Sequence, residues 1–243
     1  MLSQNEIKYL NALKVKKYRY KYQEFIVEGP KIISDLLDSG FIPVLLLLQD
    51  NFNDVRLSSL SVTKFVPESE LKKISCLQTP YFAFAVFKMP GRNPFLAHDE
   101  WTLALDEIQD PGNLGTIIRT ADWLGIQKIV LGKGCVDAYA PKVVQSTMGS
   151  IARVDISEVD LVEIFSKSSM PVYGGVFNGK DVKEVDFQRK GFILIGNEGH
   201  GISANIQPFI THPVTIPRIG KAESLNAAIS MAIICSKAIL GIP

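Results

Sequence analysis

"DPGNLGTIIRTADWLG", residues 110–125, is the stretch that decides the fold class of this 243-residue chain. It follows the apolar run "TLALDEI", residues 102–108, so its glycines lie between a predicted strand and a predicted helix. Such turns often bind phosphate groups. The spacing is not G-x-G-x-x-G and no G-K-[ST] follows, so the turn is neither a dinucleotide fingerprint nor a P-loop. Asn113 and Arg119 stand out instead as candidate site residues.

Strand-like and helix-like segments alternate after this stretch. Further strands are expected at "KIVLG", "IARVDI", "VYGGVF", "FILIGN" and "HPVTIP", and helices at 113–124, 141–149, 158–168, 202–210 and 224–240. Several of the strands are nearly continuous apolar runs, which is typical of strands buried on both faces of a parallel sheet. We therefore predict an α/β domain in which helices cover a mostly parallel sheet.

The stretch "KMPGRNPFLAHDE", residues 88–100, has the composition of a linker, and it places a domain boundary near residue 95. The predicted domains are 1–95 and 96–243. Strands are expected in the first at "EFIVEG", "PVLLLL", "VTKFV" and "YFAFAVF". A helix is expected at 30–40, with Pro30 near its start and Gly40 just past its end. The first domain is thus predicted to be a small α/β layer domain.

Composition excludes several classes of protein. The chain is 47% hydrophobic and 21% charged, and its apolar runs, such as Val44 to Leu48, are far too short to cross a bilayer. Three scattered cysteines predict a reducing cytoplasm and neither disulfides nor a zinc site. The three histidines are isolated, so no metal centre is expected. Residues 1–95 carry a net charge of +4 and residues 96–243 a net charge of −3, which indicates that the two parts of the chain have different functions.

Two further strand ends carry unusual residues, and ligands of open α/β sheets bind at such ends. In "FILIGNEGHGIS", residues 192–203, three glycines surround Glu198 and permit close approach of a ligand to the backbone. His200 is expected to be an exposed loop residue. In "VTIPRIGKAESLNAAISMAIICSKAI", residues 214–239, Ser224 is the expected N-cap of an apolar helix that must be buried in the core or under a partner. Capping explains Ser224 but leaves Asn226 unexplained.

A structural interpretation exists for the first stretch as well. Arg119 lies off the apolar stripe of its helix, near Thr116, and could be a solvated arginine on an amphipathic helix capped by Asn113.

Taken together, the three segments resemble the SpoU/TrmH-type family of the SPOUT RNA methyltransferases. The family's motifs occur in order as "DPGNLGTIIRTADWLG", "ILIGNEGHGIS" and "IPRIGKAESLNAAIS", and the resemblance covers essentially residues 100–240. "YAPKVVQSTMGSIARV" is similar to the segment between the first two motifs. Residues 18–90 more weakly resemble a ribosomal-protein-like substrate-binding domain. Arg218 departs from the pattern, because members often carry an apolar residue there, commonly Met.

The resemblance implies a 2′-O-ribose methyltransferase that uses S-adenosylmethionine. Family members fold the end of the catalytic domain, here roughly residues 190–235, into a deep trefoil knot, which is a rare exception to unknotted topology. They bind the cofactor in the knot and form homodimers around it. The residues carried over are Gly196, Ile216 and Leu225 for the cofactor loops and Asn113, Arg119, Glu198, Ser224 and Asn226 for the catalytic site.

The chemistry agrees with this set of residues. In-line methyl transfer to a hydroxyl needs no metal, but it needs positioning and a route for the 2′-OH proton. Deprotonating Arg119 at neutral pH would cost ~7 kcal/mol or more. We therefore expect Arg119 to act as a cationic clamp on the phosphate and ribose rather than as a literal base.

Two other functions remain open. The two-domain layout favours 23S ribosomal RNA as substrate, and the alternatives are a tRNA 2′-O-methyltransferase and a non-catalytic RNA-binding or ribosome assembly factor with the same fold. A nucleotide-dependent oxidoreductase would require the G-x-G-x-x-G fingerprint that this sequence lacks.

The basic segment "KVKKYRYKY", residues 14–22, is the expected RNA contact of the first domain. Cations can neutralise phosphates, and the interleaved Tyr18, Tyr20 and Tyr22 can stack on unpaired bases. The cations are Lys14, Lys16, Lys17, Arg19 and Lys21. A solvated, partly helical terminus is the alternative.

Overall fold

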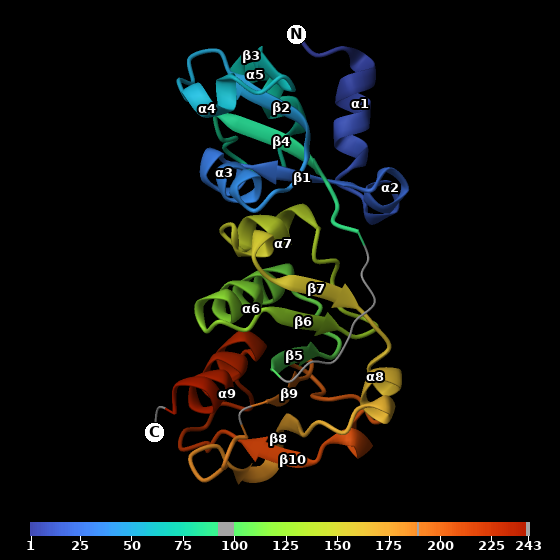
Figure 1. Cartoon of the computed structure of the whole chain (residues 1–243), viewed down its shortest axis with the longest axis vertical. Coiled ribbons are helices and arrows are strands. Elements are labelled where there is room, and N and C mark those ends of the chain that lie inside the picture. Colours follow the sequence, from blue (N-terminus) through green and yellow to red (C-terminus); the bar gives the residue numbers. More distant parts are fainter. Residues whose placement is uncertain (92–99, 189, 242–243) are drawn as a thin grey trace. The chain divides into compact units, whose positions relative to one another are not determined.

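The computed structural model describes residues 1–91, 100–188 and 190–241 (Figure 1). The boundary predicted near residue 95 falls in 92–99, outside the described residues. The chain forms two compact units, of which one comprises 1–91 with 137–153 and the other 92–136 with 154–243. By their contacts, residues 137–153 belong to the first unit and not to the second.

The first unit is built on a four-stranded mixed sheet with the strand order β1-β4-β2-β3. β4 is antiparallel to both β1 and β2, whereas β3 is parallel to β2. The strands are β1 (Glu24–Glu28), β2 (Pro43–Gln49), β3 (Thr63–Val66) and β4 (Ala83–Lys88), and the helices are α1 (Gln4–Ala12), α2 (Lys16–Tyr22), α3 (Pro30–Asp38), α4 (Val55–Ser58), α5 (Glu68–Ile74) and α7 (Pro141–Ser146). The four strands predicted for this part of the chain are confirmed, as is the helix that begins at Pro30.

The segment 137–153 is tied to the first unit by close contacts. Its helix α7 packs against β1, and the rings of Tyr139 and Phe25 lie 4.9 Å apart between centroids. Gly149 has φ +97°, and a Cβ there would lie 2.1 Å from the carboxylate of Asp35. A larger residue at position 149 would therefore strain the backbone and force the Asp35 side chain or the segment to shift.

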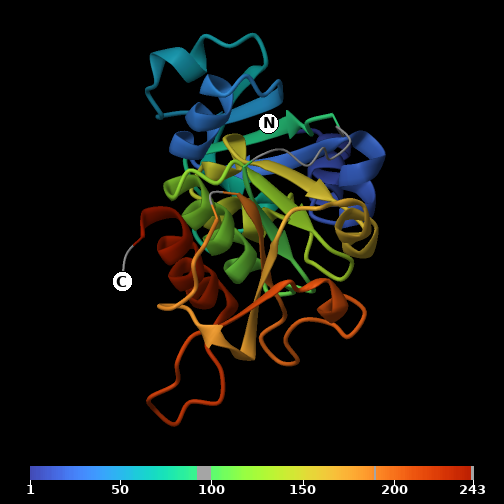
Figure 2. The same cartoon turned by 60° about the horizontal axis from the view of Figure 1, so that its bottom comes forward.

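The second unit is a six-stranded sheet in which every strand pair is parallel, with the order β10-β8-β9-β5-β6-β7. This confirms the predicted α/β class with a mostly parallel sheet. Helices α6 and α9 lie side by side on one face of the sheet, and α8 lies on the other (Figures 1 and 2). The strands are β5 (Trp101–Leu105), β6 (Lys128–Leu131), β7 (Asp155–Glu158), β8 (Val172–Asp181), β9 (Gly191–Ile195) and β10 (His212–Thr215), and the helices are α6 (Pro111–Trp123), α8 (Leu161–Lys167) and α9 (Ala227–Leu240).

Two predicted elements are wrong in detail. The helix expected at 202–210 is a short 3-10 turn, Gln207–Phe209, and Pro208, which has no backbone N–H to donate, lies inside the segment. The strand expected at "IARVDI" begins only at Asp155, because Ser150–Ala152 form a 3-10 turn after the left-handed Gly149. Among the helices of the described residues, none is long and apolar enough to cross a membrane.

Candidate active site

The first site segment follows β5, whose carboxyl end leads into α6. Asp110 is the N-cap of this helix, and its side chain accepts a hydrogen bond of 2.8 Å from the backbone N–H of Asn113. Pro111 occupies the first helical position, where no N–H is needed. The alternative in which Asn113 caps the helix is therefore wrong. With the cap supplied by Asp110, the amide side chain of Asn113 is available for other contacts.

The second segment is the tight loop after β9. The backbones of Asn197 and Gly201 exchange two hydrogen bonds of 3.0 and 2.9 Å. The Asn197 side chain fixes the loop further, because it accepts from the N–H of Gly199 and donates to the carbonyl of Glu107. A Cβ at Gly196 would lie 2.4 Å from the backbone of Gly201, so this close approach requires glycine. The loop holds Glu198 at its tip.

The third segment is the start of α9, where Asn226 is the N-cap. Its Oδ1 accepts hydrogen bonds from the N–H groups of Ala228, at 2.9 Å, and Ile229, at 3.3 Å. The expectation that Ser224 caps this helix is wrong. The helix begins at Ala227, so Ser224 lies outside it and is exposed.

Two hydrogen bonds join these three segments. The Nδ2 of Asn226 donates to the Oδ1 of Asn113 over 2.8 Å, and the Nδ2 of Asn113 donates to the Oε1 of Glu198. Three residues from distant parts of the sequence thus form one chain of polar side chains. Because each amide is bonded at both ends, its orientation is fixed.

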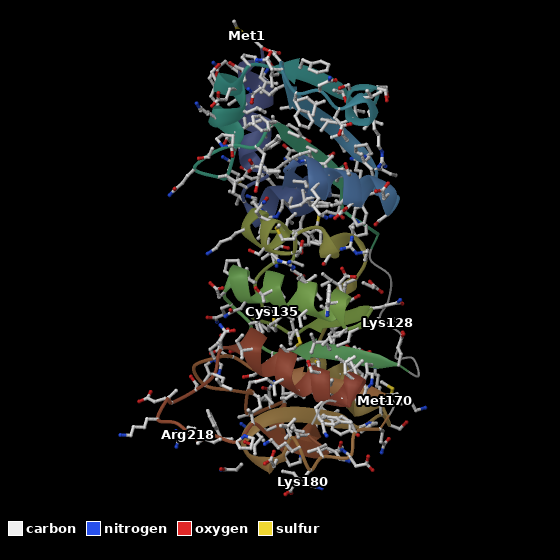
Figure 3. The ribbon with its side chains drawn as sticks, turned by 90° about the vertical axis from the view of Figure 1, so that its left-hand side faces the viewer. Met1, Lys128, Cys135, Met170, Lys180 and Arg218 are labelled. Carbon is white, nitrogen blue, oxygen red and sulfur yellow. The ribbon has the colours of Figure 1, made fainter. Side chains whose placement is uncertain are left out.

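Next to this chain lies a pocket of about 750 Å³. Its wall includes all three of the expected cofactor residues, Gly196, Ile216 and Leu225, together with Glu198 and Ser224. Much of the remaining wall is apolar and comes from β8, β9, β10 and the loop 216–226 that joins β10 to α9. Figure 2 shows this loop projecting from the end of the sheet, and Figure 3 labels Arg218 on it.

Arg119 is not brought into this arrangement. Its side chain is exposed on α6 and does not line the pocket. Within residues 1–91, 100–188 and 190–241, no hydrogen bond or ion pair holds its guanidinium. An exposed and unpaired arginine is available to a ligand that arrives from solvent.

The expected exposure of His200 is confirmed, since its side chain is 55% exposed. Its Nε2 lies 3.1 Å from a carboxylate oxygen of Glu107. In the part of the chain that the structure describes, no cluster of His, Cys, Asp and Glu side chains could hold a metal ion.

Sequence reasoning missed two residues that shape the site. Asp106, at the end of β5, is buried and accepts two hydrogen bonds of 2.7 Å from Ser203, which anchors the chain that follows the Glu198 loop. Asn197 closes that loop, as described above. An acidic residue that ends an apolar strand, as in "LALDEI", is the signal that could have identified Asp106.

The basic segment of the first unit is only partly available to a ligand. Arg19 is 2% exposed, and its Nε donates to Asp137 over 3.0 Å. Its assignment as an RNA contact is therefore wrong, because the guanidinium is buried in an ion pair. The Nζ of Lys14 donates to the carbonyl of Ser75. The other three cations of the segment, Lys16, Lys17 and Lys21, are exposed.

Comparison with known proteins places this site in a family. The model of the SpoU rRNA Methylase family matches residues 100–236, more than half of the chain. The model of the MRM3-like substrate binding domain matches residues 4–85. The 23S rRNA (guanosine(2553)-2′-O)-methyltransferase RlmP of Bacillus subtilis is 32% identical over 237 residues, which cover 94% of this chain and 94% of that protein.

Two solved structures are similar over the whole chain. A TrmH-family protein from Porphyromonas gingivalis is 37% identical with a TM-score of 0.89, and the match covers 100% of both chains. An rRNA methyltransferase from Sinorhizobium meliloti with bound AdoMet is 27% identical with a TM-score of 0.90, and the match covers 100% of this chain and 98% of that one. The chain therefore belongs to the SpoU rRNA methylase family.

Proposed function

We propose that this protein transfers the methyl group of S-adenosylmethionine to a ribose 2′-hydroxyl of large-subunit ribosomal RNA. The observation that carries the proposal is the chain Asn226–Asn113–Glu198, which joins the three motif segments at the pocket. The relationship to RlmP, a 23S rRNA 2′-O-methyltransferase that matches both units of this chain, supports this substrate over a tRNA.

The pocket suits S-adenosylmethionine in size and in chemistry. Its volume of about 750 Å³ is typical of a small-molecule site. The buried side chains of Ile195, Ile202 and Val214 offer an apolar interior for the adenosyl group, while the backbone at Gly196 and Ile216 offers hydrogen-bonding groups. The AdoMet complex of the Sinorhizobium meliloti relative supports the same cofactor. When bound, the cofactor supplies an electrophilic methyl group.

The protein's own contribution is positioning. Asn113 and Asn226 are held in single orientations, and Asn113 in turn fixes the Glu198 carboxylate at the wall of the pocket. A fixed carboxylate can orient a ribose hydroxyl for in-line attack without reorganisation during the reaction. Ser224 lines the same wall and is a second candidate for contact with the ribose.

Arg119 is assigned to the RNA in this proposal. Its guanidinium is exposed and unpaired among the described residues, so it can bind a phosphate next to the target ribose. The proton itself leaves late, to water, because a guanidinium is too weak a base at neutral pH.

We further propose that the end of the chain forms the trefoil knot expected for the family. After the central strand β9 the chain crosses to β10 at the edge of the sheet, and it then returns as α9 to pack against β9 and α6. This path, from β9 to the edge strand and back to α9, supports a knot within residues 190–235. The segments that cross in it would be the loop after β9 and the loop 216–226.

A homodimer is proposed on the basis of exposed apolar side chains on α9. Ile229, Ile233 and Leu240 are 51%, 37% and 55% exposed, and they recur on one side of the helix. Trp123, at the end of the neighbouring α6, is 88% exposed. A cluster of large apolar side chains on a protein surface favours a partner, and a second copy of the chain offers the same surface.

The first unit is proposed to select the RNA as a ribosomal-protein-like domain, with the exposed Lys16, Lys17 and Lys21 as phosphate contacts. The whole protein is proposed to be located in the cytoplasm, because Cys76, Cys135 and Cys235 are free thiols and thiols stay reduced in that compartment.

The proposed function is tested by mapping 2′-O-methyl groups in RNA from a strain that lacks the gene. We expect one 2′-O-methyl nucleotide to disappear from large-subunit RNA, and the purified protein with S-adenosylmethionine to restore it. The N113A variant is the matched control that should not restore it. Loss of a tRNA modification instead would contradict the assignment to ribosomal RNA, and unchanged RNA together with no transfer in vitro would contradict enzymatic function.

A further inference from the structure

Two opposite charges lie together on the loop 216–226 at the mouth of the pocket. Arg218 and Glu223 both line the pocket, and both are exposed. An Nη of Arg218 donates over 3.4 Å to the carbonyl of Ala222, the residue next to Glu223. The guanidinium thus reaches the backbone of its own loop one residue before Glu223.

These two groups are the uncommitted charges of the pocket wall. Glu198 accepts a hydrogen bond from Asn113, and His200 faces Glu107. Neither Arg218 nor Glu223 forms an ion pair with any residue that the structure describes. Since the rest of the wall carries no other Lys, Arg, Asp or Glu, a ligand with both a positive and a negative end matches the mouth best.

We propose that Arg218 and Glu223 bind the amino-acid end of S-adenosylmethionine, Arg218 at the carboxylate and Glu223 at the ammonium group. The proposal rests on the proposed function, because it assumes that this cofactor occupies the pocket. A guanidinium presents paired N–H donors that match a carboxylate. The zwitterion would stay at the open mouth, where it keeps part of its hydration, while the adenosyl group enters the apolar interior.

An RNA phosphate is the competing ligand for Arg218. Glu223, however, faces the same mouth and would repel a phosphate bound there. A zwitterion uses both charges, whereas a phosphate uses one and is opposed by the other. The pair therefore favours the cofactor.

The test is calorimetric titration of the full-length protein with three ligands. S-adenosylmethionine and S-adenosylhomocysteine carry the amino-acid end, and 5′-methylthioadenosine lacks it. R218M and E223Q should each bind the first two ligands about two- to fivefold more weakly, as expected for one charged contact at an exposed site. Both variants should bind 5′-methylthioadenosine as the wild type does. Lys221→Met removes a charge from the same loop at a position outside the pocket wall, and it should change none of the three affinities.

The outcomes separate the two proposals. If the wild-type protein binds none of the ligands, the proposed function fails, and this inference fails with it. If the wild type binds them but R218M loses affinity for all three equally, Arg218 acts on the loop and not on the amino-acid end. An R218M variant with unchanged affinity for the three ligands and weakened binding to RNA would assign Arg218 to the RNA and overturn the inference.

Discussion

The side-chain amide of Asn226 forms hydrogen bonds through both its oxygen and its nitrogen. Its oxygen caps α9, and its nitrogen holds Asn113. Serine is also a good N-cap but is too short to replace the contact with Asn113. N226S should therefore leave the free energy of unfolding within about 0.5 kcal/mol of the wild type. We expect its turnover to fall about 10- to 100-fold, because Asn113 is no longer positioned.

The matched variant N226A loses both contacts. It should lose turnover to the same degree and, in addition, about 1 kcal/mol of stability. Urea unfolding and single-turnover methylation measure the two effects separately. Full activity in N226S would show that the bond between the two asparagines is not needed for the reaction.

Arg119 permits a sharper test of a residue's role. If its guanidinium binds RNA, R119A should abolish methyl transfer while the affinity for S-adenosylmethionine, measured by calorimetry, stays nearly unchanged. R119K should also fail badly, because an ammonium group cannot reproduce the planar fork of donors. Near wild-type turnover in R119K would contradict the clamp.

For single residues, the sequence predicts which residues belong to the site better than it predicts the contacts of each one. The three motifs contain Asn113, Glu198 and Asn226, and hydrogen bonds join these residues in the structure. The caps were misassigned because a helix start is uncertain by a few residues in sequence, and a shift of two residues exchanges Ser224 for Asn226. The contacts of Asp106 and Asn197 depend on the folded loops, which no local pattern encodes.

Among the elements, helix α2 carries one cation that is buried in an ion pair and others that are exposed on the surface. Arg19 and Asp137 are both buried, whereas Lys17 on the same helix is exposed. Arg19→Ala would leave the Asp137 carboxylate buried without its cation, which costs about 3–5 kcal/mol. Urea unfolding should show this loss, while Lys17→Ala should change stability by less than about 0.5 kcal/mol. Equal stability of the two variants would contradict a structural role for the ion pair.

The exposed lysines of the same element should act on RNA instead. Replacing Lys16, Lys17 and Lys21 by Ala should weaken RNA binding across sequences and flatten its salt dependence by ~0.7 to 0.9 in log–log slope for each lost contact. Cofactor affinity should not change. Turnover at saturating RNA should fall less than apparent affinity, because mostly uniform binding energy is removed. An unchanged salt slope would show that RNA selection lies elsewhere.

Elements with a strong pattern were predictable and those held by distant contacts were not. β9 and β5 are continuous apolar runs at the centre of the sheet, and their positions were correct. The predicted helix at 202–210 has apolar residues at helical spacing, but Pro208 cannot donate the backbone hydrogen bond that an α-helix needs there. The hydrogen bonds from Ser203 to Asp106 join positions nearly one hundred residues apart, and local periodicity does not encode them.

For the whole molecule, the alternation of strands and helices was sufficient to predict a parallel sheet in the second unit. It did not predict that residues 137–153 leave that unit for the first. The segment's own composition is that of an ordinary loop and helix, and its place depends on pairs such as Arg19 with Asp137 and Tyr139 with Phe25. These pairs join positions more than one hundred residues apart.

The assembly of the whole molecule can be tested at α9. If two copies meet through its exposed face, the wild type should sediment as a dimer at micromolar concentration, and Ile229→Glu should sediment as a monomer. A carboxylate buried without a partner costs about 3–5 kcal/mol, and a two-fold interface would bury two of them. The fold should tolerate the change, because Ile229 is 51% exposed and an acidic residue in the first turn of a helix is favourable. Val55→Glu, an exposed apolar position in the first turn of α4, is the matched control and should remain dimeric. A wild-type monomer, or a dimer that persists in Ile229→Glu, would show that the exposed face of α9 is not the interface.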